Sequence, residues 1–224
     1  MKFFQNLLLL SVITVLSLSG AGAATASPAE NTLTPDQITA LEKRFDELGV
    51  KEEKRSLLLE KIAKGELLDS ENPKMEDKGI VTHSENFNTF SKTQEKIVKT
   101  EYPDGSITIN AITGGTATCG SGYCNFKKVK ISGGNTFIQV YYYVDYTKVD
   151  QGLDYIADAY DENLQATLGA SYSDEKLTIV RAKETLRDPA KVSLKWNFSG
   201  GGLKTTQYLH FYLGDDKESD EFVR

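Results

Sequence analysis

The chain has 224 residues, with 26 basic and 32 acidic side chains and a formal net charge of -6. This length supports one domain with its own core, and the acidic balance argues against a nucleic-acid-binding surface, because phosphate contacts need clustered Lys and Arg. The short basic cluster Lys127, Lys128 and Lys130 is split between two faces by strand alternation, so we expect no nucleic-acid partner.

The N-terminus has the pattern of a cleavable signal peptide over residues 1–26. Lys2 precedes an apolar run from Leu7 to Leu18, and Ala24-Thr25-Ala26 fits an A-x-A cleavage site. An uncleaved anchor is the alternative, but the run is shorter than the roughly 20 residues that span a bilayer. No later stretch of the sequence is apolar enough to cross a membrane. We therefore expect a secreted, extracellular protein that is cut after Ala26.

Residues 27–68 are predicted to form a helical hairpin. Thr34 is the expected N-cap of the first helix, with Pro35 at its first position and Gln37 completing a capping box. Gly49 ends this helix, and Gly65 ends a second one that begins near residue 52. The apolar faces could lie on a membrane, but we favour packing against a partner within the protein. The stripe of the first helix consists of Ile38, Leu41, Phe45 and Leu48.

The rest of the chain is predicted to be a linker followed by a β domain. Residues 69–93 are polar and lack a clear hydrophobic period, which is typical of a linker. Over 94–224 the period changes to two, which predicts a mainly β fold, an antiparallel β-sandwich or a barrel-like domain. Residues 153–168 fit either a helix or a strand with a loop. The expected strands are 96–102, 106–112, 126–132, 136–146, 177–183, 190–199 and 205–213.

Strand alternation assigns a core and a second, outward face to three of these strands. The expected core residues are Ile138, Val140, Tyr142, Val144, Tyr146, Val192, Leu194, Trp196, Phe198, Leu209, Phe211 and Leu213. The second faces carry the candidate binding residues Phe137, Tyr141, Tyr143, Tyr208, His210 and Tyr212. If the two strands concerned are neighbours, these form one aromatic stripe that can stack on sugar rings and hydrogen-bond through its hydroxyls. The alternative is that the helical hairpin covers this face, as is usual for a sheet with two apolar faces.

Two cysteines, Cys119 and Cys124, lie close together in the sequence. In a secreted protein such a pair is usually a disulfide, and the intervening Gly120-Ser121-Gly122 can adopt the backbone angles of a tight ring. A redox-active pair would favour C-x-x-C spacing. We therefore predict a structural disulfide.

No motif assigns a reaction to the chain. The two histidines, His83 and His210, are far apart and lack metal-ligand spacing, and neither the Gly-x-Ser-x-Gly elbow nor the Asp-x-Asp-x-Asp-Gly calcium loop is present. Neighbouring acids such as Asp158 and Asp161 could serve glycoside hydrolysis. Adjacency alone is uninformative in a chain with 32 acidic residues. We expect no catalytic residues, no metal site and no cofactor.

Several short motifs resemble segments of known secreted domains. They are Gly120-Ser121-Gly122-Tyr123, Asp145-Tyr146-Thr147, Arg181 to Glu184 and Asp188-Pro189-Ala190-Lys191. Through them, residues 116–216 resemble a family of proteins secreted by Gram-positive bacteria and described as domain of unknown function 5626. The resemblance extends to Leu59-Glu60-Lys61-Ile62, Gly65-Glu66-Leu67, Asp69-Ser70 and Tyr102 to Ser106. It implies secretion and a β-rich domain but no reaction, and the two cysteines depart from the family's usual pattern.

These observations favour a secreted, non-enzymatic module that binds a cell-wall glycan or another part of the cell envelope. The alternative is a secreted antimicrobial protein, similar to a large bacteriocin, that acts on the surface of other bacterial cells.

The cleavage prediction is checked by the intact mass of protein collected from culture medium. We expect a mature chain that starts at Ser27 and therefore carries a net charge of -7, since residues 1–26 contain one Lys and no acid. A mass that still includes residues 1–26 would contradict the prediction.

Overall fold

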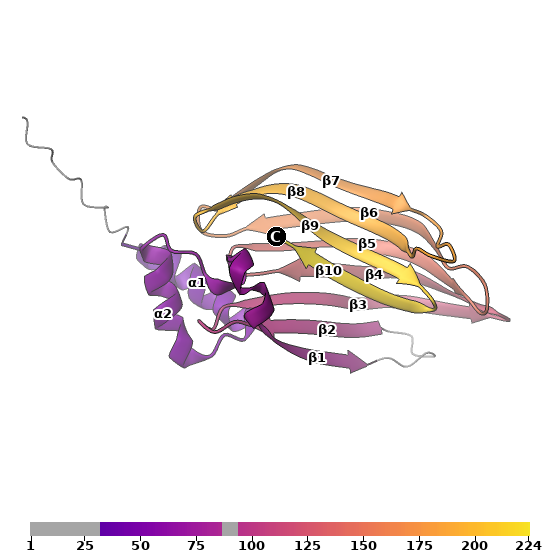
Figure 1. Cartoon of the computed structure of the whole chain (residues 1–224), viewed down its shortest axis with the longest axis horizontal. Helices are drawn as coiled ribbons and strands as arrows, with labels where there is room; N and C mark the ends of the chain where they lie inside the picture. Colours follow the sequence, from indigo (N-terminus) through magenta and orange to yellow (C-terminus); the bar gives the residue numbers. More distant parts are fainter. Residues whose placement is uncertain (1–31, 87–93) are drawn as a thin grey trace, which may run out of the picture.

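The computed structural model describes residues 32–86 and 94–224, so the expected signal peptide and its cleavage site lie outside the described residues. Within these ranges the chain forms a helical hairpin, two short 3-10 turns and two antiparallel β-sheets that pack face to face as a sandwich. Figure 1 shows the helices at one end of the sandwich, beyond the ends of the strands. None of the described helices is long and apolar enough to cross a membrane.

The two helices begin and end as the sequence predicts. Helix α1 (Pro35–Leu48) starts with a capping box, in which the Thr34 hydroxyl accepts from the Gln37 amide and the Gln37 side chain accepts from the Thr34 amide. Gly49 closes α1 in the left-handed conformation, with φ 69°. Helix α2 (Glu52–Ala63) follows. Leu41, Phe45, Leu48 and Leu58 are buried in the same hydrophobic cluster as the strand residues, so the hairpin packs on the sandwich.

Each sheet is a meander in which strands adjacent in sequence pair with one another. In spatial order, the six-stranded sheet contains β1 (Ile80–Asn86), β2 (Gln94–Glu101), β3 (Ile107–Gly120), β4 (Tyr123–Gly134), β5 (Ile138–Val149) and β6 (Tyr155–Ala166). The four-stranded sheet contains β10 (Lys217–Val223), β9 (Leu203–Gly214), β8 (Ala190–Gly200) and β7 (Ser171–Arg181). The chain passes from one sheet to the other between β6 and β7. Strand β10 lies against β3 and β4, so β1 and β2 extend past the edge of the smaller sheet.

The core lies between the sheets and consists of the residues that alternation assigns to it. All twelve predicted core side chains on β5, β8 and β9 are no more than 2% exposed. Trp196 is completely buried, and its indole N–H donates to Oε1 of Gln207 at 3.1 Å. This bond satisfies the one polar group of the largest core side chain, so its burial carries no cost for an unpaired donor.

The segment expected to be a linker has regular structure in its described part, so that expectation is wrong there. It forms the 3-10 turns η1 (Asp69–Glu71) and η2 (Pro73–Lys78) and then strand β1. Strand β1 lies at the edge of its sheet and pairs with β2 along its whole length. Backbone pairing needs no hydrophobic period, which explains why the sequence gives no strand signal. Residues 87–93 lie outside the described residues, and the ambiguous segment 153–168 forms strand β6.

The predicted disulfide between Cys119 and Cys124 is confirmed. The two cysteines oppose each other directly at the end of the β3–β4 hairpin, with their Cα atoms 4.0 Å apart. Gly122 takes a left-handed φ of 79° in the turn between them. The bond therefore closes the tip of a long hairpin, where β4 also pairs with β5 through Tyr123 and Cys124.

A network of charged and polar groups fastens the helical end to the sandwich. Asp69 lies in η1 and Asp104 in the β2–β3 turn. The Asp104 carboxylate accepts from the Asp69 amide at 2.8 Å, and the Asp69 carboxylate accepts from the Asp104 amide at 3.1 Å. The Lys61 ammonium, on α2, donates to Asp104 at 2.7 Å and to Asp69 at 3.0 Å. The Ser106 hydroxyl donates to Asp104 and accepts from the amide of Ser70. We call Lys61, Asp69, Asp104 and Ser106 the polar clasp.

Asp104 is the centre of the polar clasp. Burial alone would raise the pKa of its carboxyl, but hydrogen bonds from Lys61 and Ser106 outweigh burial and hold the pKa below its usual value. The clasp joins two segments that are distant in the sequence, Asp69-Ser70 and Tyr102 to Ser106.

We predict that Asp104→Ala lowers the free energy of unfolding by about 3 kcal/mol, because it leaves Lys61 short of a partner in a partly buried site. Chemical denaturation followed by circular dichroism measures the change. Asp77→Ala is the matched control, since Asp77 is exposed and pairs only with its neighbour Lys78, and it should leave the stability unchanged. Equal unfolding midpoints for the two variants would refute the role given to the clasp.

Candidate functional site

The condition for one continuous aromatic stripe, that the two strands are neighbours, is not met, and the candidate residues are divided between two opposite surfaces. Strand β5 belongs to the six-stranded sheet and β9 to the four-stranded sheet, and the two strands are not neighbours. Tyr141 and Tyr143 lie on the outer face of the first sheet, and Tyr208, His210 and Tyr212 lie on the outer face of the second. Alternation assigns the faces of each strand correctly but carries no information about strand order.

Phe137 is a core residue, and its predicted place on the second face is wrong. Its side chain is 2% exposed, because β5 begins only at Ile138 and Phe137 belongs to the turn before it. The Phe137 amide donates to the side chain of Asn135 at 2.9 Å, and its ring lies against Gly201 in the β8–β9 turn.

The helical hairpin does not cover the outer face of the four-stranded sheet. Arg44 on α1 donates to the carbonyl of Asn135 at 2.9 Å, and Lys61 on α2 reaches the β2–β3 turn. These contacts fix the helices at the end of the sandwich, as Figure 1 shows. The alternative in which the hairpin buries the residues of β9 is therefore wrong, and Tyr208, His210 and Tyr212 remain partly exposed.

On the six-stranded sheet the tyrosines mostly contact one another and nearby charged groups. Tyr143 stacks on Tyr160 of β6 with ring centroids 6.1 Å apart, and the Lys130 ammonium lies 4.2 Å from the ring centroid of Tyr141. The Tyr160 hydroxyl donates to Asp145 at 3.0 Å. Burial and this hydrogen bond raise the pKa of Tyr160 to about 12. Much of this surface is therefore already engaged within the protein.

Strand β9 carries a continuous row of three rings, which we call the aromatic row: Tyr208, His210 and Tyr212. His210 lies between the tyrosines, with ring centroids 5.4 Å from Tyr208 and 5.8 Å from Tyr212. The Tyr212 hydroxyl donates to Glu221 at 3.0 Å, whereas the Tyr208 hydroxyl has no hydrogen-bond partner in the described part of the chain. Burial lowers the pKa of His210, and the neighbouring Lys191 lowers it further. Both effects favour the neutral form of the His210 imidazole.

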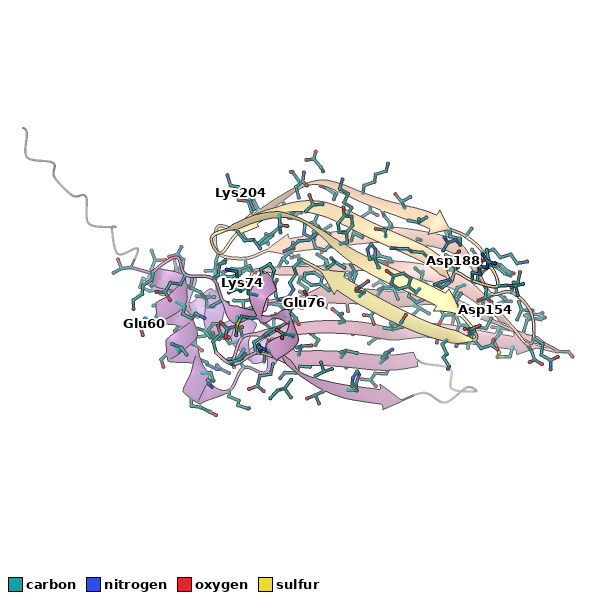
Figure 2. All side chains as sticks on the ribbon, viewed as in Figure 1. Glu60, Lys74, Glu76, Asp154, Asp188 and Lys204 are labelled. Atoms are coloured by element: carbon teal, nitrogen blue, oxygen red, sulfur yellow. A yellow bond between two sulfur atoms is a disulfide. The ribbon has the colours of Figure 1, made fainter. Side chains whose placement is uncertain are left out.

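Two hollows border the aromatic row, one near each end of the four-stranded sheet. The first, of about 430 Å³, is lined by residues of β7, β8 and β9, which include the rings of Tyr172 and Phe198 and the polar groups of Ser173, Asn197 and Thr206. The second, of about 500 Å³, is lined by residues 184–189, the β9–β10 turn and Tyr212. Figure 2 shows Lys204 and Asp188, which line the two hollows, at opposite ends of the sheet. Along β9, the first hollow is followed by the three rings of the aromatic row and then by the second hollow.

The residues of the first hollow were not identified from the sequence, although strand alternation could have identified two of them. Lys204 and Thr206 share the alternation of Tyr208 and therefore point to the same face. Ser173 and Asn197 come from neighbouring strands, and they join the site only because β7 and β9 both pair with β8.

In the described part of the chain, burial raises the pKa of three carboxyl groups: Glu71, Asp154 and the partly buried Asp220. Burial raises the pKa of Glu71 to about 7 and that of Asp220 to about 6. Asp220 points from edge strand β10 into the space between the sheets, where neither carboxylate oxygen has a hydrogen-bond partner among the described residues. In residues 32–86 and 94–224 no group of three or more His, Cys, Asp or Glu is placed to hold a metal ion.

In comparisons with known proteins, no protein-family model, curated protein or solved structure matches this chain. The family resemblance of residues 116–216 remains a prediction.

Asp220 should make the protein less stable as the pH rises. Its pKa is about 6 when folded and near 3.8 when unfolded, so protonated Asp220 contributes stability below pH 3.8 that is lost as the pH rises through 6. We predict that Asp220→Asn exceeds the native protein in free energy of unfolding by about 3 kcal/mol at pH 7.5. This difference should vanish near pH 3.5. Denaturant titrations at both pH values measure it, and a constant difference would contradict the assignment.

Proposed function

We propose that this protein is a secreted, non-enzymatic module that binds cell-envelope glycan through the outer face of its four-stranded sheet. The observation that carries the proposal is the aromatic row, a partly exposed line of three rings between two hollows. An extended ligand on this face would meet flat apolar surfaces in the middle and hydrogen-bonding groups at one end.

The chemistry of the row suits a sugar better than a purely apolar ligand. Each tyrosine presents an apolar ring body and a polar tip, so one side chain can stack on a sugar ring and hydrogen-bond a hydroxyl. Tyr208 is the best placed, because its hydroxyl has no partner in the described part of the chain. The nearby Thr206 and Asn197 bond to each other at 2.9 Å and have further capacity for sugar hydroxyls.

Rigidity is a second argument for this face. The row lies on β9, which is hydrogen-bonded on both sides, to β8 and to β10. The opposite side of β9 is fixed in the core by Leu209, Phe211 and Leu213, all fully buried. A binding surface on such a strand is ordered before the ligand arrives, which lowers the entropy cost of binding.

The test is retention of the mature protein on purified cell-wall material, compared between two matched tyrosine variants. We predict that Tyr208→Ala weakens retention about tenfold, because one stacking contact with its hydrogen bond contributes about 1.4 kcal/mol. Tyr141→Ala, on the outer face of the other sheet, is the control and should leave retention unchanged. Both proteins should stay folded by circular dichroism.

Two results would count against the proposal. Retention that is equal in the native protein and in Tyr208→Ala would remove the aromatic row from binding. Killing or permeabilisation of intact bacteria, without retention on their walls, would favour the antimicrobial alternative.

A further inference from the structure

The outer face of the four-stranded sheet gathers positive charge on an otherwise acidic protein. Lys176 of β7, Lys191 and Lys195 of β8, and Lys204 of β9 all lie on this face, as their cross-strand pairing shows. In the described part of the chain none of the four has an acidic group within salt-bridge distance. The acids outnumber the bases 32 to 26 over the chain, so a face that carries four lysines departs from the overall charge balance.

Two of these lysines are arranged against the usual rule for sheets. Lys176 and Lys195 are directly opposed in the β7–β8 register. Like charges in this position repel and destabilise the strand pair. The acidic side chains on this side of the sheet, Asp174 and Glu221, accept from Asn197 and Tyr212 and form no salt bridge with the two lysines. A local rule that is broken in this way is typical of a functional site.

Positive charge and aromatic rings alternate across this face. Lys195 is directly opposite Tyr208, and Lys191 is directly opposite Tyr212, with its ammonium 4.9 Å from the ring centroid. A ring stacked on Tyr208 would therefore place its substituents within reach of the Lys195 ammonium. A polymer that carries both a sugar ring and an anionic group in each repeat would match both features.

We infer that the ligand of this face is an anionic polysaccharide, whose repeat bears a phosphodiester or carboxylate group. The inference rests on the proposed glycan-binding function and adds the charge of the glycan. The lysines come from three strands between residues 176 and 204, which explains why the sequence alone shows no basic cluster here. An excess of positive charge on a face attracts a partner of opposite charge and orients it as it approaches.

The test uses the full mature protein and three soluble polymers: polygalacturonate as the carboxylate probe, poly(glycerol phosphate) as the phosphodiester probe, and dextran as the neutral probe. We expect at least one anionic polymer to bind more tightly than dextran. In the double variant Lys176→Gln/Lys195→Gln the affinity for that polymer should fall about fivefold, as expected for the loss of two exposed ionic contacts. Its melting temperature should not fall, because the substitutions remove a repulsion.

The control variant is Lys127→Gln/Lys128→Gln, which makes the same change in net charge on the six-stranded sheet and should bind like the native protein. Equal binding of dextran and the anionic polymers, weakened by Tyr208→Ala, would overturn the inference while leaving the proposed function intact. Absence of binding both to every polymer and to purified cell wall would overturn the proposed function. Binding of anionic lipid vesicles or single-stranded DNA as tight as that of the polysaccharides would also overturn the inference.

Discussion

The polar clasp between the helical hairpin and the β2–β3 turn is the interaction on which the arrangement of this molecule depends. Asp69 and Asp104 each use a carboxylate to bind the backbone of the other segment, and Lys61 bridges both. Removing the partner of a buried or half-buried charge is strongly destabilising, so alternatives to this geometry are costly. The clasp therefore holds the helices at one particular end of the sandwich.

This position determines which surfaces remain accessible. A helical hairpin with an apolar stripe usually lies across the open face of a sheet. Here Leu41 and Phe45 reach the core from its end, and Arg44 secures the β4–β5 turn by bonding to the carbonyl of Asn135. The core is closed without either outer face being used for it. The aromatic row on β9 and its flanking lysines are left available for this reason.

The sequence predicted the local structure well and the arrangement of strands poorly. The alternation through Trp196 and through Tyr142 identified core residues correctly, because a side-chain period of two reflects burial directly. The capping box at Thr34 predicted the start of α1. Strand β1 could not be predicted, since an edge strand with polar side chains has no hydrophobic period. Phe137 was assigned to the wrong face, because the residue where β5 begins depends on the turn geometry.

For the candidate site, too, the residues within one strand could be predicted, whereas the arrangement of the strands could not. Tyr208, His210 and Tyr212 could be grouped from one strand, whereas their separation from Tyr141 and Tyr143 depends on the order of strands in two sheets. Lys176 joins Lys195 through cross-strand pairing alone. The residue pattern of a single strand does not show which residues of other strands will lie beside it. The positive charge of this face could therefore not be predicted from the sequence.

The buried carboxylate of Asp220 has a further consequence for how molecules of this protein meet one another. Strand β10 is the free edge of its sheet, where unpaired backbone groups can recruit a strand from a second molecule and begin aggregation. Glu218 and Asp220 both point inward from this edge, and Glu218 is held by Lys148 and Tyr146. A strand added beside β10 would remove the remaining water around Asp220 and leave its charge still more isolated. An ionised Asp220 at this edge would therefore disfavour pairing with a strand of a second molecule.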